Sequence, residues 1–114
     1  MVSDHGWLVG FPGAVTVCDE RGTIIAMNDR SASTFEGDGG RALVGRDLRD
    51  CHPEAARAKL DQLFDSRQTN VYTIRKHGLR KLIYQSPWHR DGKFAGIVEL
   101  SLEIPEEIPE FIRL

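Results

Sequence analysis

The chain has 114 residues, of which 40% are hydrophobic and 28% charged, and its net charge is −2 at pH 7. These values predict one globular domain that buries a core without disulfide bonds. They exclude the clustered basic surface of a nucleic-acid-binding protein, and the sequence lacks the run of about 18 apolar residues that a membrane span needs. With two cysteines and no signal-peptide pattern at the N-terminus, we expect reduced thiols in the cytoplasm.

The first predicted elements are a β-hairpin and a short helix. The β-rich runs AVTVCD and TIIAMN, separated by ERG, predict two strands joined by a turn. Asn28 or Asp29 can cap the helix that DRSASTFE favours, because either side chain accepts a hydrogen bond from an unpaired backbone N–H. The glycines of GDGG end this helix, and RALVGRDLRD after them is compatible with one or two helical turns.

A second helix is predicted to begin at Pro53. The missing N–H of proline costs nothing at the first helical position, and Glu54 suits the positive end of a helix. Apolar side chains then recur at i, i+4, i+7 and i+8 and form one stripe, which consists of Ala56, Leu60, Leu63 and Phe64. The stripe predicts a helix that packs on a core.

Three strands follow the helix: NVYTIRK, LRKLIYQSPW and KFAGIVELSLEI, with turns at His77-Gly78 and at HRDG. In the last strand, four apolar residues from Val98 to Ile104 alternate with Glu99, Ser101 and Glu103, which predicts one buried and one wetter face. Strands grouped on both sides of a helical block predict an α+β fold, in which helices cover one face of an antiparallel sheet.

The order of these elements and several motifs resemble a PAS domain. AVTVCDERGTIIAMNDRSASTF is similar to the opening hairpin of that family, GGRALVGRDL to its small helices, HPEAARAKLDQL to the start of its long helix, and GKFAGIVELSLEI to its closing strand. The chain also resembles small single-domain bacterial PAS proteins with the pattern CHPE…KL…NVYTI…IYQ.PW. The resemblance covers residues 10–105, which leaves an N-terminal extension (1–9) and a C-terminal tail (106–114).

The resemblance implies a five-stranded antiparallel sheet with helices packed on one face. Many PAS domains hold a small molecule between the helices and the sheet, and many dimerise. Eight residues are expected to line such a pocket or to fill the core in its place, because sequence does not distinguish the two. We expect Asn28 to act mainly as a helix cap and Tyr84 to orient a ligand through its hydroxyl. The eight are Met27, Asn28, Phe35, His52, Leu60, Phe64, Tyr84 and Leu100.

Cys51 and His52, directly before Pro53, are the candidates for chemistry. Some PAS proteins bind haem through a histidine on the helix that faces the sheet, so the resemblance leaves haem at His52 open. The alternative, which we favour, is that DCHPE is only a helix start. A thiol near a helix N-terminus has a lowered pKa and is reactive, whereas the simpler interpretation of Cys51 is a small buried apolar side chain. A flavin cofactor is not expected, because the Asn-Cys-Arg motif of flavin-binding PAS domains is missing.

No catalytic or metal-binding pattern stands out. The four histidines and two cysteines lack the short paired spacing of zinc ligands, and the serines lack a glycine elbow or an identifiable base. We therefore expect no enzymatic activity. The alternative is a small isomerase with a cone-shaped α+β fold and a carboxylate base in its pocket.

The tail IPEEIPEFIRL is too apolar for a free end, and Pro105 and Pro109 prevent one long helix through it. We expect it to pack on the outer face of the sheet or on a second subunit. The predicted function is a sensory or signalling PAS module that binds a small ligand or a partner protein and acts as a homodimer. Since no output domain follows, it acts on a partner in trans or belongs to a longer protein. The alternatives are a haem-based redox or gas sensor that uses His52 and a ligand-free dimerisation scaffold.

Overall fold

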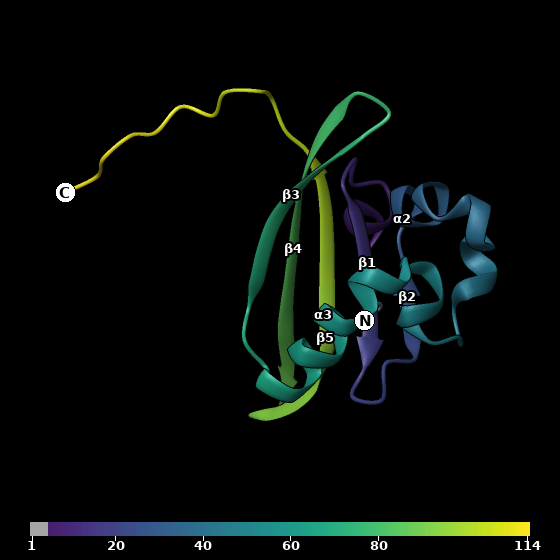
Figure 1. Ribbon diagram of the computed structural model, residues 1–114. Coiled ribbons are helices and arrows are strands. Elements are labelled where there is room, and N and C mark those ends of the chain that lie inside the picture. Colours follow the sequence, from purple (N-terminus) through teal and green to yellow (C-terminus); the bar gives the residue numbers. More distant parts are fainter. Residues whose placement is uncertain (1–4) are drawn as a thin grey trace.

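The computed structural model describes residues 5–114, which form a five-stranded antiparallel sheet with helices on one face (Figure 1). The strands are β1 (Ala14–Asp19), β2 (Ile24–Met27), β3 (Asn70–Lys76), β4 (Leu79–Arg90) and β5 (Lys93–Glu103). Their spatial order is β2-β1-β5-β4-β3, so the opening hairpin and the last three strands meet at the central β5. The predicted α+β class and antiparallel sheet are confirmed.

Short helices precede β1 and fill the chain between β2 and β3. They are α1 (Gly6–Val9), α2 (Asp29–Thr34), the 3-10 helices η1 (Glu36–Asp38), η2 (Gly40–Leu43) and η3 (Leu48–Cys51), and α3 (Glu54–Ser66). Asn28 caps α2 as predicted, because its side chain accepts the backbone N–H of Ser31 at 3.0 Å. The helix predicted from Pro53 is also confirmed, although Pro53 is its N-cap and not its first residue. Among residues 5–114, no helix is long and apolar enough to cross a membrane.

Two tight turns make β3, β4 and β5 a continuous meander. His77 and Gly78 have φ angles of 53° and 77°, and Asp91 and Gly92 have φ angles of 51° and 78°. A two-residue turn of type I′ needs positive φ at both positions, and its twist matches that of the strands that it connects. The turns that the sequence predicted after residues 76 and 90 are therefore confirmed.

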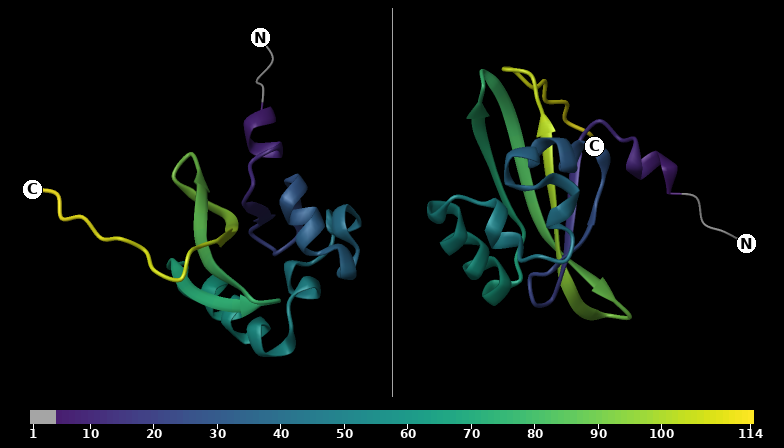
Figure 2. Two further views of the ribbon diagram at one scale, coloured as in Figure 1. Left: turned by 90° about the horizontal axis from the view of Figure 1, so that it is seen from above. Right: turned by 90° about the vertical axis from the view of Figure 1, so that its right-hand side faces the viewer.

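The core lies between the helices and the inner face of the sheet, and Figure 2 shows the helical layer on one side and the tail on the other. The apolar stripe of α3 contributes Leu60 and Leu63, while Phe64 is partly buried and packs edge-on against Phe94. The buried cluster consists of Cys18, Ile24, Met27, Leu43, Leu48, Cys51, Leu60, Leu63 and Ile97.

The charged face of β5 points into the domain. Glu99 is only 4% exposed and pairs in register with Thr16 of β1 and Gln85 of β4. Leu100 pairs with Tyr84 and points to the opposite face, because successive side chains on a strand alternate. The alternation was predicted correctly, but the expectation that Leu100 and Tyr84 line a pocket is wrong. Both lie on the outer face of the sheet, which the helices do not cover.

Candidate functional site

A cavity of about 330 Å³ lies between the helices and the inner face of β3, β4 and β5. Its middle is mostly apolar, with walls from Phe35, Pro53, Ala56, Ile74 and Ile83. The strand register places Glu99 and His52 at one end and Lys76 and Lys81 at the other, with Tyr72 between them. A largely apolar cavity of this size with a few polar groups is typical of a small-molecule site.

His52 closes one end of this cavity. It lies between η3 and α3 in extended backbone (φ −121°, ψ 144°), as expected for a residue that precedes proline. This conformation turns the imidazole toward the sheet, where its side chain is only 8% exposed. The segment DCHPE therefore starts a helix and also delivers a buried histidine to the sheet.

Both nitrogens of His52 face oxygen acceptors. Nδ1 lies 2.9 Å from the backbone oxygen of Leu48, and Nε2 lies 3.0 Å from Oε2 of Glu99. A neutral imidazole has one N–H, whereas the imidazolium has two and satisfies both oxygens. Burial alone would lower the pKa of His52, but hydrogen bonds with Cys51 and Glu99 and the charge of Glu99 raise it to about 10. His52 and Glu99 therefore form a buried ion pair at neutral pH.

The ion pair is one end of a hydrogen-bond network that crosses three strands. Nε2 of Gln85 donates a hydrogen bond to Oε2 of Glu99 at 2.6 Å, and Nδ2 of Asn70 donates one to Oε1 of Gln85 at 2.9 Å. Burial, followed by the charge of Glu99, raises the pKa of the nearby Tyr72 phenol. Within residues 5–114, every buried side-chain nitrogen and oxygen has a partner. A network satisfied in this way holds the helical layer and the sheet in one arrangement.

Haem ligation by His52 does not fit this geometry. Iron binds a ring nitrogen through its free electron pair, whereas both nitrogens of His52 already lie within hydrogen-bond distance of an oxygen, on Leu48 and on Glu99. Ligation would separate the ion pair and leave the Glu99 carboxylate buried without its cation, which is strongly unfavourable.

Cys51 lies beside His52 but plays a local role. Its thiol donates to the same backbone oxygen of Leu48 at 3.1 Å, and its sulfur is 3.4 Å from Nδ1 of His52. The side chain is 6% exposed and belongs to the core cluster. This placement agrees with a small buried side chain at the start of the helix.

Of the eight residues expected at a pocket, the structure brings Phe35 and His52 to the cavity wall. Met27, Leu60 and Phe64 pack in or against the core instead, and Tyr84 and Leu100 lie on the outer face. The side chain of Asn28 accepts the N–H of Val15 at 2.9 Å and donates to the backbone oxygen of Gly13 at 2.8 Å. Asn28 therefore joins α2 to the start of β1 and takes no part in the cavity wall.

The sequence-based prediction missed the polar half of the site, which consists of Asn70, Tyr72, Lys76, Lys81, Gln85 and Glu99. One signal was available. Glu99 and Gln85 interrupt apolar runs in long strands, and a carboxylate in such a place is seldom buried without a partner. The partner itself, His52, lies 47 residues away along the chain from Glu99, so only the folded chain identifies it.

Comparison with known proteins places this architecture in a family. A family model described as "PAS fold" matches residues 8–108. No curated protein sequence matches the chain.

Three solved structures share the fold. The PAS domain of BvgS from Bordetella pertussis is 24% identical, with a TM-score of 0.65 over 89% of this chain and 83% of that one. The PAS domain of the histidine kinase ThkA is 19% identical, with a TM-score of 0.63 over 78% and 96%. The Aer2 receptor from Vibrio cholerae, described as a dual PAS-heme oxygen sensor, is 16% identical, with a TM-score of 0.62 over 82% and 95%. The chain therefore belongs to the PAS-fold family, whose members are sensory and signalling modules that generally have no enzymatic activity.

Proposed function

We propose that this PAS domain is a sensor that binds a small, largely apolar molecule in the cavity beneath α3 and passes the signal on through the sheet. The observation that carries the proposal is the cavity of about 330 Å³ whose wall includes the buried pair His52 and Glu99. An apolar hollow of this size with a few polar groups at its ends is the usual form of a small-molecule site. Both cysteines of this domain, Cys18 and Cys51, are buried free thiols, which supports a reducing compartment such as the cytoplasm.

The ion pair offers a way for the cavity to act on the rest of the molecule. His52 belongs to the junction of η3 and α3, and Glu99 belongs to β5, which leads directly into the C-terminal tail. A ligand shifts the protein toward one arrangement only by binding it more tightly than another. A molecule that reaches Glu99 or His52 would favour a different spacing between the helices and β5, and the tail would carry this change to a partner protein.

A cavity-filling substitution tests the proposal. Ala56 lines the cavity, whereas Ala58 lies two residues further along α3 and is exposed. Native mass spectrometry of protein purified from cells should show bound excess mass in the wild type and in Ala58→Trp but not in Ala56→Trp. Excess mass that persists in Ala56→Trp would place the ligand outside this cavity. If the wild type carries no excess mass and its Ile74 and Ile83 methyl resonances do not respond to small apolar compounds, the sensor proposal fails.

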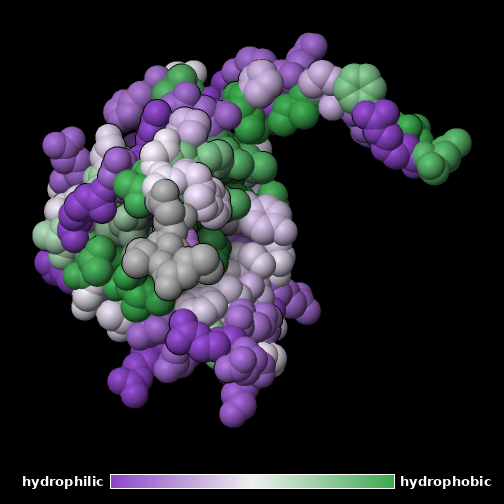
Figure 3. Space-filling view, turned by 180° about the vertical axis from the view of Figure 1, so that it is seen from behind, coloured by the Kyte–Doolittle hydropathy of each residue, from purple (hydrophilic) through white to green (hydrophobic). Residues whose placement is uncertain are grey.

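A homodimer is a second candidate function, supported by a different surface. The outer face of the sheet carries a row of partly exposed apolar residues over β1, β3, β4 and β5: Val17, Val71, Leu82, Tyr84, Val98, Leu100 and Leu102. The tail beyond Glu103 exposes four more, with Ile108 at 57%, Phe111 at 72%, Ile112 at 82% and Leu114 fully exposed. Figure 3 shows hydrophobic surface beside the base of the tail and again near its end.

The first residues of the tail are fixed, and this sets its direction. Arg75 binds both carboxylate oxygens of Glu106, and Nη1 of Arg80 donates to the backbone oxygens of Pro105 and Glu106 at 3.2 and 2.9 Å. From there the tail extends away from its own domain on the side opposite the helices (Figure 2). We propose that the tail of each copy covers the outer sheet face of a second copy, because the exposed apolar tail and the exposed apolar face are complementary.

Sedimentation of a tail variant tests the dimer. Replacing Phe111 and Ile112 together by aspartate removes two large apolar contacts per tail, each worth about 1.5–3 kcal/mol when buried. We expect the dimer to dissociate at least about a hundredfold more readily. Glu110→Gln is the control and should sediment as the wild type does. A wild type that is monomeric at high concentration, or a double variant that stays dimeric, would contradict this arrangement.

A further inference from the structure

The inner face of β3 and β4 changes in character along the strands. At the level of Asn70 and Gln85 it is polar and hydrogen-bonded to Glu99, and at the level of Tyr72 and Ile83 it is mostly apolar. Lys81 pairs with Ile74 at the next level, and Lys76 pairs with Leu79 at the level after that. The cavity therefore has a neutralised ion pair at one end and two lysines at the other.

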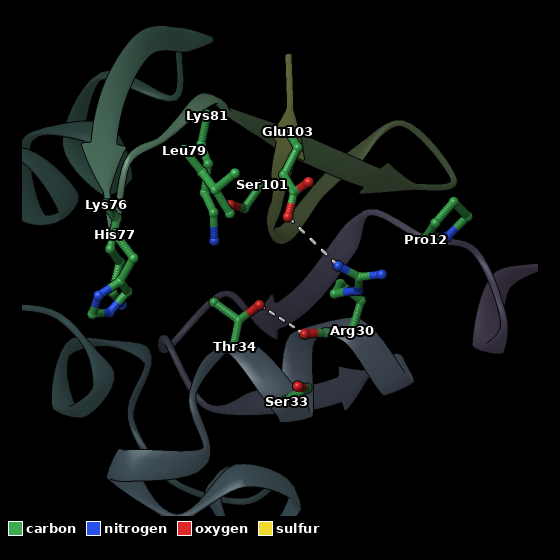
Figure 4. A pocket seen from close by; sticks show the side chains of 10 residues that line it. All are labelled: Pro12, Arg30, Ser33, Thr34, Lys76, His77, Leu79, Lys81, Ser101 and Glu103. Carbon is green, nitrogen blue, oxygen red and sulfur yellow. Dashed lines mark hydrogen bonds and ion pairs between the residues drawn. The ribbon is translucent and has the colours of Figure 1, made fainter. Parts of the chain in front are cut away.

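A second, more open hollow of about 300 Å³ continues from the lysine end. The two hollows share Thr34, Lys76, Lys81 and Ser101, so these residues mark their junction. In Figure 4, Lys76 and Lys81 lie on the β3–β4 side of the second hollow, while Arg30 and Glu103 face each other on its far side. A molecule that enters through the open hollow must pass the lysines to reach the apolar cavity.

The charges at this junction are unbalanced. Glu103 is 3.7 Å from Arg30 and is neutralised by it, and Glu99 is neutralised by His52. Within residues 5–114, the side chains of Lys76 and Lys81 have no hydrogen-bond or ion-pair partner, although Lys81 stands opposite Glu103 in the register of β4 and β5. Lys76 is exposed and Lys81 is half-buried, so both ammonium groups lie at the mouth of the apolar cavity, where they favour an anion over a neutral or cationic group.

We infer that the cavity takes an amphipathic monoanion, with its carboxylate between Lys76 and Lys81 and its apolar body on Phe35, Ile74 and Ile83. This inference rests on the proposed function, since it names the class of ligand for the same cavity. The volume of about 330 Å³ accommodates roughly ten non-hydrogen atoms at about 30 Å³ each. A straight-chain carboxylate such as octanoate is of this size and is therefore a suitable probe.

The test compares three probes that have the same hydrocarbon tail and differ in charge: octanoate, 1-octanol and octylammonium. Titrations followed by the Ile74 and Ile83 methyl resonances should give the tightest binding for octanoate, about tenfold tighter than for octanol, and the weakest for octylammonium. The double variant Lys76→Gln with Lys81→Gln should lose the preference for octanoate and keep the affinity for octanol. Lys93→Gln, which alters an exposed lysine away from the cavity, is the matched control and should behave as the wild type does.

The possible results separate the two proposals. Equal affinity for octanoate and octanol, or an undiminished preference for octanoate in the double variant, overturns the anion inference and leaves the cavity as a binding site. Binding of all three probes that persists in Ala56→Trp overturns the proposed site itself. Failure of all three probes to bind the wild type overturns both.

Discussion

The ion pair between His52 and Glu99 predicts that the free energy of unfolding of this protein depends on pH. The pKa of His52 is about 10 in the folded protein against an ordinary 6.5, and each pKa unit corresponds to about 1.4 kcal/mol. The raised pKa therefore corresponds to at most about 4–5 kcal/mol of stabilisation, to which Cys51 and Glu99 both contribute. The share of Glu99 is consistent with the roughly 3–5 kcal/mol lost when one partner of a buried pair is removed. Because the folded-state pKa is raised, this stabilisation is fully present below about pH 6.5 and is lost as pH rises through about 10.

Glu99→Gln is the informative substitution. Glutamine has nearly the same shape and can still bond to Gln85, but it removes the charge that, together with Cys51, raises the pKa of His52. At about pH 6 we expect the free energy of unfolding to fall by about 3 kcal/mol, which lowers the melting temperature by roughly 10–15 °C for a domain of this size. At about pH 10.5 the wild type has also lost the pair and keeps a buried carboxylate without a cation, so the loss in Glu99→Gln should disappear or reverse.

Urea unfolding followed by circular dichroism at these two pH values measures the difference. Glu103→Gln is the control, because Glu103 lies on the same face of β5 in an exposed pair with Arg30. Its effect should stay within about 0.5 kcal/mol at both pH values. A loss in Glu99→Gln that is equal at both pH values would show that the side chain acts through shape and hydrogen bonding alone. No loss at either pH would refute the ion pair.

Three further predictions concern the scaffold around the site. Gly96→Ala should lower the free energy of unfolding in urea by about 3 kcal/mol or more, because its Cβ would lie 1.9 Å from the backbone oxygen of Cys18, at a φ of +145°. Gly37→Ala is the control and should be neutral, since its Cβ meets nothing within 4 Å. Similar losses in both variants would contradict this reasoning. Asn28→Ala should lower the free energy of unfolding by about 2–4 kcal/mol, since it removes a helix cap and leaves buried backbone groups unpaired. Asn28→Asp keeps the acceptor oxygen and should lower this free energy by less. The opposite ranking of the two variants would refute the role of the side-chain oxygen. Burial raises the pKa of the Cys18 thiol to about 11. Iodoacetamide at about pH 8 should therefore label Cys18 in urea but not in the folded protein. Equal labelling rates in the two states would show that β1 opens readily.

Local patterns in the sequence were sufficient for the elements and their order. The cap at Asn28, the turn at His77-Gly78 and the apolar stripe of α3 each depend on residues that are near one another in the chain. Side-chain periodicity and backbone preferences act over this range, so these features could be predicted before folding was considered. The family resemblance then followed from the order of the elements.

The face that each strand buries could not be decided in the same way. Alternation in β5 indicated two different faces, but which one meets the helices depends on the pairing of β5 with β1 and β4. In this protein the face with Glu99 is buried, because His52 and Gln85 supply the hydrogen bonds that a buried carboxylate requires. The apolar face with Leu100 is left outside, where it is available to a second copy.

The candidate site is likewise a product of tertiary structure. Cys51 and His52 stood out in the sequence, but the chemistry of His52 is set by Leu48 on one nitrogen and by Glu99 on the other. The lysines at the far end of the cavity come from two strands that are adjacent only because the β3–β4 hairpin aligns Ile74 with Lys81. Composition, periodicity and capping determine local structure, whereas charge pairing and cavity shape depend on contacts between distant residues that exist only in the folded chain.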